Sequence, residues 1–215
     1  MATPGSAETV AGPDGRGTRG TRSRAGNAMG RTHEAALRGA LAAISKYGSR
    51  KATMGDIALL AGIAKATLYN HFRTREDVYA AVAAAEVDAI AAAADAKLAD
   101  GFAAAVAEAA RLLSDHAAVR RVATDDPATL VLLATPGDGP VWTAARTHVA
   151  AALSEAGYVP TPSAVDLVLR YLTSQVLSPS TPDERVDAAA LITRAVSGQL
   201  QLPDSDPAGS ADTSS

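Results

Sequence analysis

The stretch AGIAKATLYNHFRTREDV, residues 61–78, decides the fold of this chain. Gly62 can adopt a positive φ at little cost, so it predicts a tight turn between two short helices. In the segment before the turn, Thr53 is a suitable helix N-cap, and Asp56 three residues later favours the positive end of a helix. Two helices joined by a three-residue turn at a steep angle form a helix-turn-helix.

The residue types in the two short helices predict a buried side and an exposed side. We expect the core contacts to come from an apolar set: Ile57, Ala58, Leu60, Ala61, Ile63 and Leu68. The residues left to face outward in the second helix, expected over 64–71, are short side chains or polar donors: Lys65, Ala66, Thr67, Tyr69, Asn70 and His71. Such donors are the kinds of side chain that contact phosphates and bases. Phe72 is expected in the core.

An apolar repeat beginning at His33 predicts a helix before this pair. Apolar residues recur at intervals of three and four along it: Ala36, Leu37, Ala40, Leu41 and Ile44. Tyr47 ends the apolar face, and Gly48 is a plausible residue just past the helix C-terminus. Three helices and a basic flank therefore agree on a DNA-binding domain over residues 31–78.

The segment IALLAGIAKATLYNHFRTREDVYAAV resembles the TetR family of transcriptional regulators over roughly residues 33–80. The resemblance implies that the third helix lies in the major groove of DNA. It further implies phosphate contacts from Tyr69, His71 and Arg75, and base-facing positions at Lys65, Ala66 and Thr67. We add Asn70 and Thr53 to the expected DNA contacts. Met54 and Gly55 depart from the family, where polar contact residues are common early in the second helix.

The rest of the chain predicts further helices and no strands, so the expected fold is all-α. Thr74 and Asp77 predict the start of a helix of more than twenty residues, which a long alanine run favours. Further helices are expected over 101–116, from Pro127, from Pro140 to Gly157, from Pro162, and from Pro182 after a Thr181–Glu184 capping box. We assign residues 79–202 to a helical ligand-binding and dimerisation domain.

Apolar stripes on the last two of these helices fit either a core or an interface with a second copy. The stripes are Val165, Val168, Leu169, Leu172 and Val176, followed by Val186, Ala189, Ala190, Thr193, Val196 and Leu200. In the TetR family the last two helices pair with their copies, and helix-turn-helix proteins commonly dimerise to read two half-sites. A homodimer is therefore expected.

The two ends of the chain and its charge complete the domain assignment. Residues 1–30 and 203–215 are rich in small and polar residues and are expected to be disordered. The first of these tails carries arginines that suit a DNA-tracking arm, but an inert leader, or a true start at Met29, explains it equally well. Residues 1–80 hold 12 of the 20 lysines and arginines against 6 of the 23 acidic residues. A basic front suits a polyanion such as DNA, whereas the acidic remainder would be repelled by one.

The resemblance also implies a ligand pocket in the second domain. Candidate contacts are Trp142, Arg146, Phe102, His116 and Tyr171. None of these residues forms a motif, and core packing for Trp142 or helix capping for His116 is an alternative explanation. Few polar residues interrupt the expected core, so we expect a largely apolar effector.

Other function classes have weaker support in the sequence. The chain lacks cysteine, and His33, His71, His116 and His148 show no metal-ligand spacing, so we expect no metal, no cofactor and no catalytic residues. No apolar run long enough to span a membrane and no signal peptide occur, which favours a cytoplasmic protein. The sequence therefore predicts a ligand-responsive repressor released from its operator by a small molecule. A ligand-independent architectural DNA-binding protein and an all-helical enzyme are the alternatives.

Overall fold

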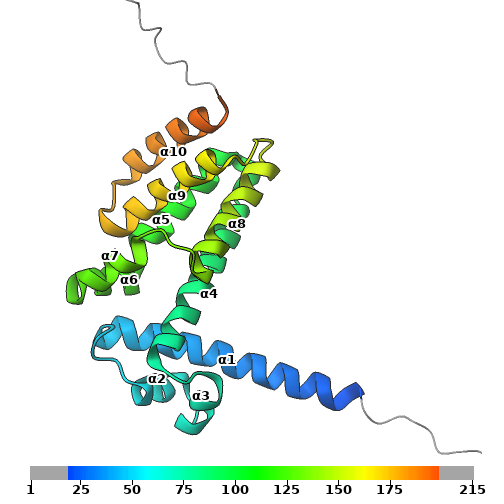
Figure 1. The fold of residues 1–215 in the computed structure, drawn as a ribbon, viewed down its shortest axis with the longest axis vertical. Helices are drawn as coiled ribbons and strands as arrows, with labels where there is room; N and C mark the ends of the chain where they lie inside the picture. The colour runs from blue at the N-terminus through cyan, green and yellow to red at the C-terminus, as the bar shows by residue number, and fades with distance from the viewer. Residues whose placement is uncertain (1–18, 199–215) are drawn as a thin grey trace, which may run out of the picture.

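The computed structural model describes residues 19–198 of the chain, and throughout this range the secondary structure is helical, without strands. The helices form two layers joined by one long helix (Figure 1). The lower layer consists of α1 (Arg19–Tyr47), α2 (Met54–Ala61) and α3 (Lys65–His71), from which α4 (Arg75–Asp95) rises into the second layer. The prediction of an all-α fold is confirmed.

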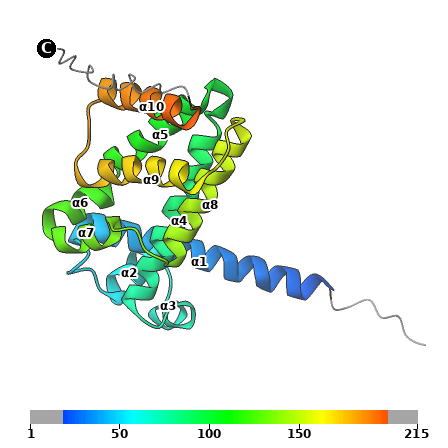
Figure 2. The ribbon, with the colours of Figure 1, turned by 45° about the horizontal axis from the view of Figure 1, so that its top comes forward.

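The second layer is built around the upper part of α4. It consists of a short 3-10 helix η1 (Leu98–Asp100), α5 (Phe102–Asp115), α6 (Ala117–Asp125), α7 (Pro127–Ala134), α8 (Pro140–Glu155), α9 (Pro162–Leu177) and α10 (Pro182–Val196). Helix α8 runs alongside α4, and α10 lies over α5 and α9 (Figure 2). Helix α6 was not expected from the sequence; it packs against α1 and so joins the two layers.

Side-chain caps fix where the central helices begin. Thr53 accepts a hydrogen bond from the Asp56 amide, and the Asp56 carboxylate accepts one from the Thr53 amide at 2.9 Å. Thr74 and Asp77 form the same capping box at the start of α4, as Thr181 and Glu184 do at α10. Gly62 closes α2 with φ of 66°, as predicted. The helix-turn-helix is therefore set by local sequence.

The interior of the first layer departs from the prediction at Leu60. The buried face of α2 consists of Met54, Ile57 and Ala58, which lie three and four residues apart, and Leu68 and Phe72 complete the core beneath them. Leu60 is 37% exposed, because at about 3.6 residues per turn its side chain lies beyond the edge of this face, on the side of Ile57 away from Ala58. The expectation that Leu60 is buried was therefore wrong.

A close crossing of α1 and α2 depends on Gly39. A Cβ atom added at this residue would lie 2.6 Å from the Cβ atom of Ala61 and 2.7 Å from the carbonyl oxygen of Ile57. Only glycine therefore lets the two helices approach this closely.

The first helix is longer than the apolar repeat predicts. It begins at Arg19, so residues 19–30 are helical where a disordered arm was expected. The remainder of that arm and the C-terminal tail beyond residue 198 lie outside the described residues. No helix in residues 19–198 is both long enough and apolar enough to cross a membrane.

The stripes on the last two helices have different environments. Val165, Val168 and Leu169 of α9 are buried within the chain, so that stripe is a core face. On α10, Ala189 is fully buried whereas Val186 is 61% exposed. The outward faces of the two helices keep four large apolar side chains: Leu167, Leu177, Val186 and Leu191.

Candidate functional site

The exposed face of α3 gathers the residues predicted to contact DNA. Its core side is Leu68, which is fully buried, and this orients Lys65, Tyr69 and Asn70 outward on the opposite side. The Lys65 ammonium lies 5.9 Å from the centre of the Tyr69 ring, an arrangement favourable for a cation–π contact. Ala66 and Thr53 are also exposed, and Thr67 is half-buried. The helix thus presents an ammonium, a phenol and an amide to solvent.

His71 has neighbours that the sequence did not reveal. Its ring lies 6.0 Å from that of His33 on α1, and both rings lie near Phe72. His71 is only half-buried, so a phosphate contact from it stays a prediction.

Arg75 already has several partners within the protein. Its Nη1 donates to the carbonyl oxygens of Arg50, at 3.1 Å, and Ala52, at 3.4 Å. Its Nε and Nη2 donate to the Glu76 carboxylate, and its guanidinium lies 5.6 Å from the centre of the Tyr79 ring. Arg75 therefore ties the α1–α2 loop to the start of α4. Its role as a phosphate contact stays a prediction.

Two titratable groups near the helix-turn-helix have shifted pKa values, one because of a helix cap and one because of burial. Hydrogen bonds from the Thr53 side chain and backbone hold the pKa of the Asp56 carboxyl below its usual value. Burial raises the pKa of Tyr79, whose hydroxyl donates to the Ser49 carbonyl oxygen at 2.9 Å. The Tyr79 phenol therefore stays a neutral donor and fixes the end of α1 against α4.

A cavity of about 560 Å³ lies against α4. It follows one face of this helix from Glu76 to Asp95, a rise of about 28 Å at 1.5 Å per residue. Many side chains on this face are alanines, which are too small to fill the space between α4 and its neighbours. The alanine run therefore favours the helix and also leaves the cavity.

The cavity reaches both layers of the fold. Leu41, Ile44 and Ser49 line its lower part, and Trp142 and Val149 of α8 line part of its wall. A molecule filling it would touch the DNA-binding layer directly as well as the second layer.

Three of the five predicted ligand contacts line this cavity: Phe102, His116 and Trp142. Arg146 does not line it, because its Nη1 donates to the Gly137 carbonyl oxygen at 2.9 Å in the preceding loop. Tyr171 does not line it either, since its hydroxyl is directed to the Arg185 carbonyl oxygen on α10. The pocket role predicted for these two residues finds no support in the geometry.

Polar groups are few along the cavity wall. The Nε2 atom of His116 lies 2.8 Å from the Glu86 carboxylate, and its Nδ1 accepts from the Val119 amide, so His116 also caps α6. His116 therefore has a capping role, but at the start of α6, which was not expected, and not only at the end of the helix expected over 101–116. Ser49 is 7% exposed, and its hydroxyl has no hydrogen-bond partner within residues 19–198. A serine shortly after the end of a helix is common, so the sequence gave no sign that the Ser49 hydroxyl is buried without a partner.

No three metal-ligating side chains come together in the part of the chain that the structure describes. The histidines of the second layer pair instead with carboxylates of α4: His116 with Glu86, and His148 with Asp88 at 2.8 Å. These pairs attach α4 to α6 and α8.

Comparison with known proteins agrees with this architecture. Residues 36–82 match the family model described as bacterial regulatory proteins, tetR family. Among solved structures, the chain is similar to the TetR family repressor AlkX from Dietzia sp. strain DQ12-45-1b, implicated in biodegradation of n-alkanes. That match has a TM-score of 0.63 at 20% identity and covers 77% of this chain and 95% of AlkX. No curated protein matches the chain in sequence.

Two further solved structures have the same fold. One is a putative TetR-family transcriptional regulator from Mesorhizobium loti MAFF303099, with a TM-score of 0.53, 16% identity, and coverage of 80% of this chain and 97% of that one. The other is a putative TetR-family regulator from Rhodococcus sp., with a TM-score of 0.51, 20% identity, and coverage of 78% and 98%. The chain therefore has a TetR-family N-terminal domain and the overall fold of TetR-family transcriptional regulators.

Proposed function

We propose that this protein is a homodimeric repressor that binds operator DNA through α3 and is released from it by a small molecule. The observation that carries the proposal is the position of α4. It begins at Arg75, directly after the short loop that follows α3, and its length forms one wall of the cavity. A change in the cavity thus has a direct mechanical route to the DNA-binding face.

DNA binding in this proposal divides between two kinds of contact. Tyr69 and His71 contact phosphates, which fix the register of the protein on the duplex. Lys65 and Thr67 lie in the first turn of α3, where side chains reach base edges in the major groove. In this proposal the arginines between residues 16 and 31, most of which belong to the first part of α1, supply additional phosphate contacts.

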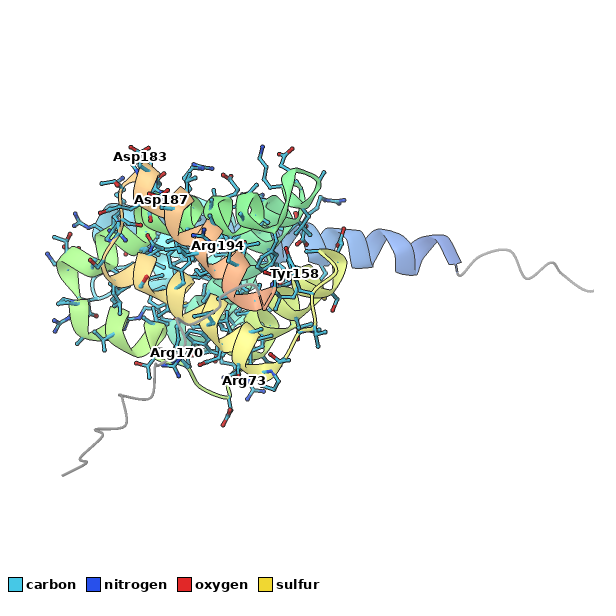
Figure 3. All side chains as sticks on the ribbon, turned by 90° about the horizontal axis from the view of Figure 1, so that it is seen from above. Arg73, Tyr158, Arg170, Asp183, Asp187 and Arg194 are labelled. Atoms are coloured by element: carbon cyan, nitrogen blue, oxygen red, sulfur yellow. The ribbon has the colours of Figure 1, made fainter. Side chains whose placement is uncertain are left out.

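Dimerisation in this proposal uses the outward faces of α9 and α10. These faces carry Leu167, Leu177, Val186 and Leu191, of which Val186 and Leu191 are at least half exposed. Figure 3 looks down on this region, where Asp183, Asp187 and Arg194 are carried by α10 and Arg170 by α9. Residues of both charges around an apolar centre suit a two-fold interface, in which the same patch meets its copy.

Release in this proposal is a shift between two states of the dimer. A ligand that prefers the state with misaligned recognition helices by about 3 kcal/mol lowers operator affinity ~150-fold. Because Glu86 and His116 join α4 to α6, and α6 packs on α1, the bound ligand acts on both supports of the DNA-binding layer.

Selection of duplexes from a randomised library by the purified protein tests the proposal. We expect enrichment of a symmetric sequence whose half-sites lie about one helical turn apart. Binding of all duplexes with equal affinity would instead favour the architectural alternative. A cavity ligand should then release the selected duplex in a fluorescence anisotropy titration, whereas an unchanged complex would contradict ligand control.

A further inference from the structure

Among the described residues, the lining of the cavity includes acidic residues but no lysine or arginine. Three acidic residues line it, Glu76, Glu86 and Asp95, and His116 and His148 also line it. The Glu76 carboxylate is already paired with Arg75, and Asp95 is exposed at the far end of α4. Glu86, whose side chain is 32% exposed, is therefore the carboxylate best placed to meet a molecule inside the cavity.

The partner of Glu86, His116, contacts only one of its two carboxylate oxygens. The Nδ1 atom of His116 accepts a hydrogen bond from the Val119 amide, so the ring of the neutral histidine carries its proton on Nε2. That proton is donated to one oxygen of Glu86, across 2.8 Å. The second oxygen of Glu86 can still accept a hydrogen bond, and His116, which caps α6, holds the side chain in place.

A second polar residue, Ser49, is among those that line the same cavity. The Ser49 hydroxyl is buried and lacks a hydrogen bond in the described part of the chain. The Tyr79 hydroxyl donates to the Ser49 carbonyl oxygen, and Tyr79 precedes Glu86 by about two helical turns, so Ser49 lies nearer the start of α4 than Glu86 does.

We infer that the cavity binds an elongated aliphatic cation, whose ammonium group pairs with Glu86 while its chain lies along the alanine face of α4. This inference rests on the proposed effector binding and gives the chemical class of the effector. The apolar wall explains affinity for the chain, since about 25 cal/mol is gained per Å² of apolar surface buried. The carboxylate without a nearby lysine or arginine explains the charge preference, because an anionic head group would be repelled.

Three probes of equal chain length test this class: decylammonium, decanol and decanoate, each titrated at pH 7 below its micelle concentration. Their affinities can be measured by calorimetry and by the emission of Trp142, which lines the cavity. We expect decylammonium to bind at least tenfold more tightly than decanoate, with decanol between them. Equal or tighter binding of decanoate, or no binding of any probe, would overturn the inference.

Variants of Glu86 and Asp88, both on α4, test whether Glu86 is the cause of the preference for the cationic probe. Glu86→Gln keeps an acceptor for His116 and removes the charge, so it should abolish the tenfold preference, whereas Glu86→Asp should retain most of it. Asp88→Asn is the matched control, because Asp88 pairs with His148 in the same way but does not line the cavity. An unchanged preference in Glu86→Gln, or an equal loss in Asp88→Asn, would contradict the assignment to Glu86.

The same probes separate this inference from the proposed function. DNA release by decylammonium is measured in parallel on the selected duplex. Binding that depends on Glu86 without release of DNA supports the ligand class and contradicts ligand control of the repressor. Release of DNA by decanoate and not by decylammonium supports ligand control and overturns the ligand class.

Discussion

Arg75, the first residue of α4, donates a hydrogen bond of 3.1 Å from Nη1 to the carbonyl oxygen of Arg50 in the loop between α1 and α2. A second carbonyl oxygen, that of Ala52, lies 3.4 Å from the same nitrogen. The helix that leads into the second layer is thus joined to the loop that positions the helix-turn-helix.

Replacing Arg75 should therefore lower the stability of the fold, whether or not Arg75 also contacts DNA. We expect Arg75→Ala to lower the free energy of unfolding by about 1–3 kcal/mol, because the carbonyl oxygens of Arg50 and Ala52 lose a charged donor, and the hydrogen bond to Ala52 is partly buried. Arg75→Lys should rescue this only in part, since an ammonium cannot reproduce the fork of the guanidinium. Urea unfolding monitored by circular dichroism measures both. Unchanged stability in Arg75→Ala would show that these hydrogen bonds contribute nothing measurable.

The exposed face of α3 gives a prediction about specificity. Tyr69→Phe should weaken binding to the selected duplex and to a scrambled duplex about equally, because phosphates carry no sequence information. Lys65→Ala should mainly reduce the preference for the selected duplex, by roughly 1–3 kcal/mol for a lost base contact. Both affinities are measured by anisotropy at one salt concentration. The reverse pattern would exchange the roles of the two residues.

Two glycines of α1 should respond in opposite directions to the same substitution. Gly39→Ala places a Cβ atom 2.6 Å from the backbone nitrogen of Ala61, and should destabilise the fold by about 1–3 kcal/mol through overpacking. Gly30→Ala is the control, because no atom lies within 4 Å of its added Cβ atom. There we expect a gain of about 0.5–1 kcal/mol from helix propensity. Thermal unfolding of both variants tests the contrast, and a stabilised Gly39→Ala would mean that α2 can move away.

The proposed dimer interface predicts which surface leucine matters. Leu191, on the outward face of α10, is 50% exposed, and Leu191→Glu should shift the protein from dimer to monomer. Burying a carboxylate at the centre of a two-fold interface brings it close to its own copy. Val131→Glu is the control, because Val131 is similarly exposed but belongs to α7 and to neither of the two helices of the proposed interface. Sedimentation velocity distinguishes the outcomes, and a dimeric Leu191→Glu variant would rule out this face.

Most helix boundaries could be predicted because the signals are local. The side chains of Thr53, Thr74 and Thr181 each cap a helix by accepting a hydrogen bond from the amide three residues later. A threonine followed three residues later by an acidic residue can be recognised in a single sequence. Helix α6 was missed because His116, its N-cap, is an unusual capping residue and the segment carries no proline or glycine signal at its start.

The candidate site was less predictable because it depends on contacts between distant residues. Nothing near Arg75 in sequence indicates that it bonds to the carbonyl oxygens of residues 50 and 52. The pairing of Glu86 with His116 joins residues thirty positions apart. The face of α4 that borders the cavity was visible only as an alanine run, which predicts a helix whether or not a cavity lies beside it.

The last prediction concerns the Ser49 hydroxyl, which is buried without a partner among residues 19–198, whereas the buried Ser114 hydroxyl donates to Gln175 Oε1 at 3.2 Å. Ser49→Ala should raise the free energy of unfolding of the ligand-free protein by about 1 kcal/mol, because an unsatisfied polar group is removed. Ser114→Ala should lower it by a similar amount, because Gln175 loses a partner. Urea denaturation of both variants measures the difference. If Ser49 provides a hydrogen bond to a cavity ligand, the same Ser49→Ala change should also weaken ligand binding, so that stability and affinity move in opposite directions. A loss of stability in both variants would instead show that an ordered water satisfies Ser49.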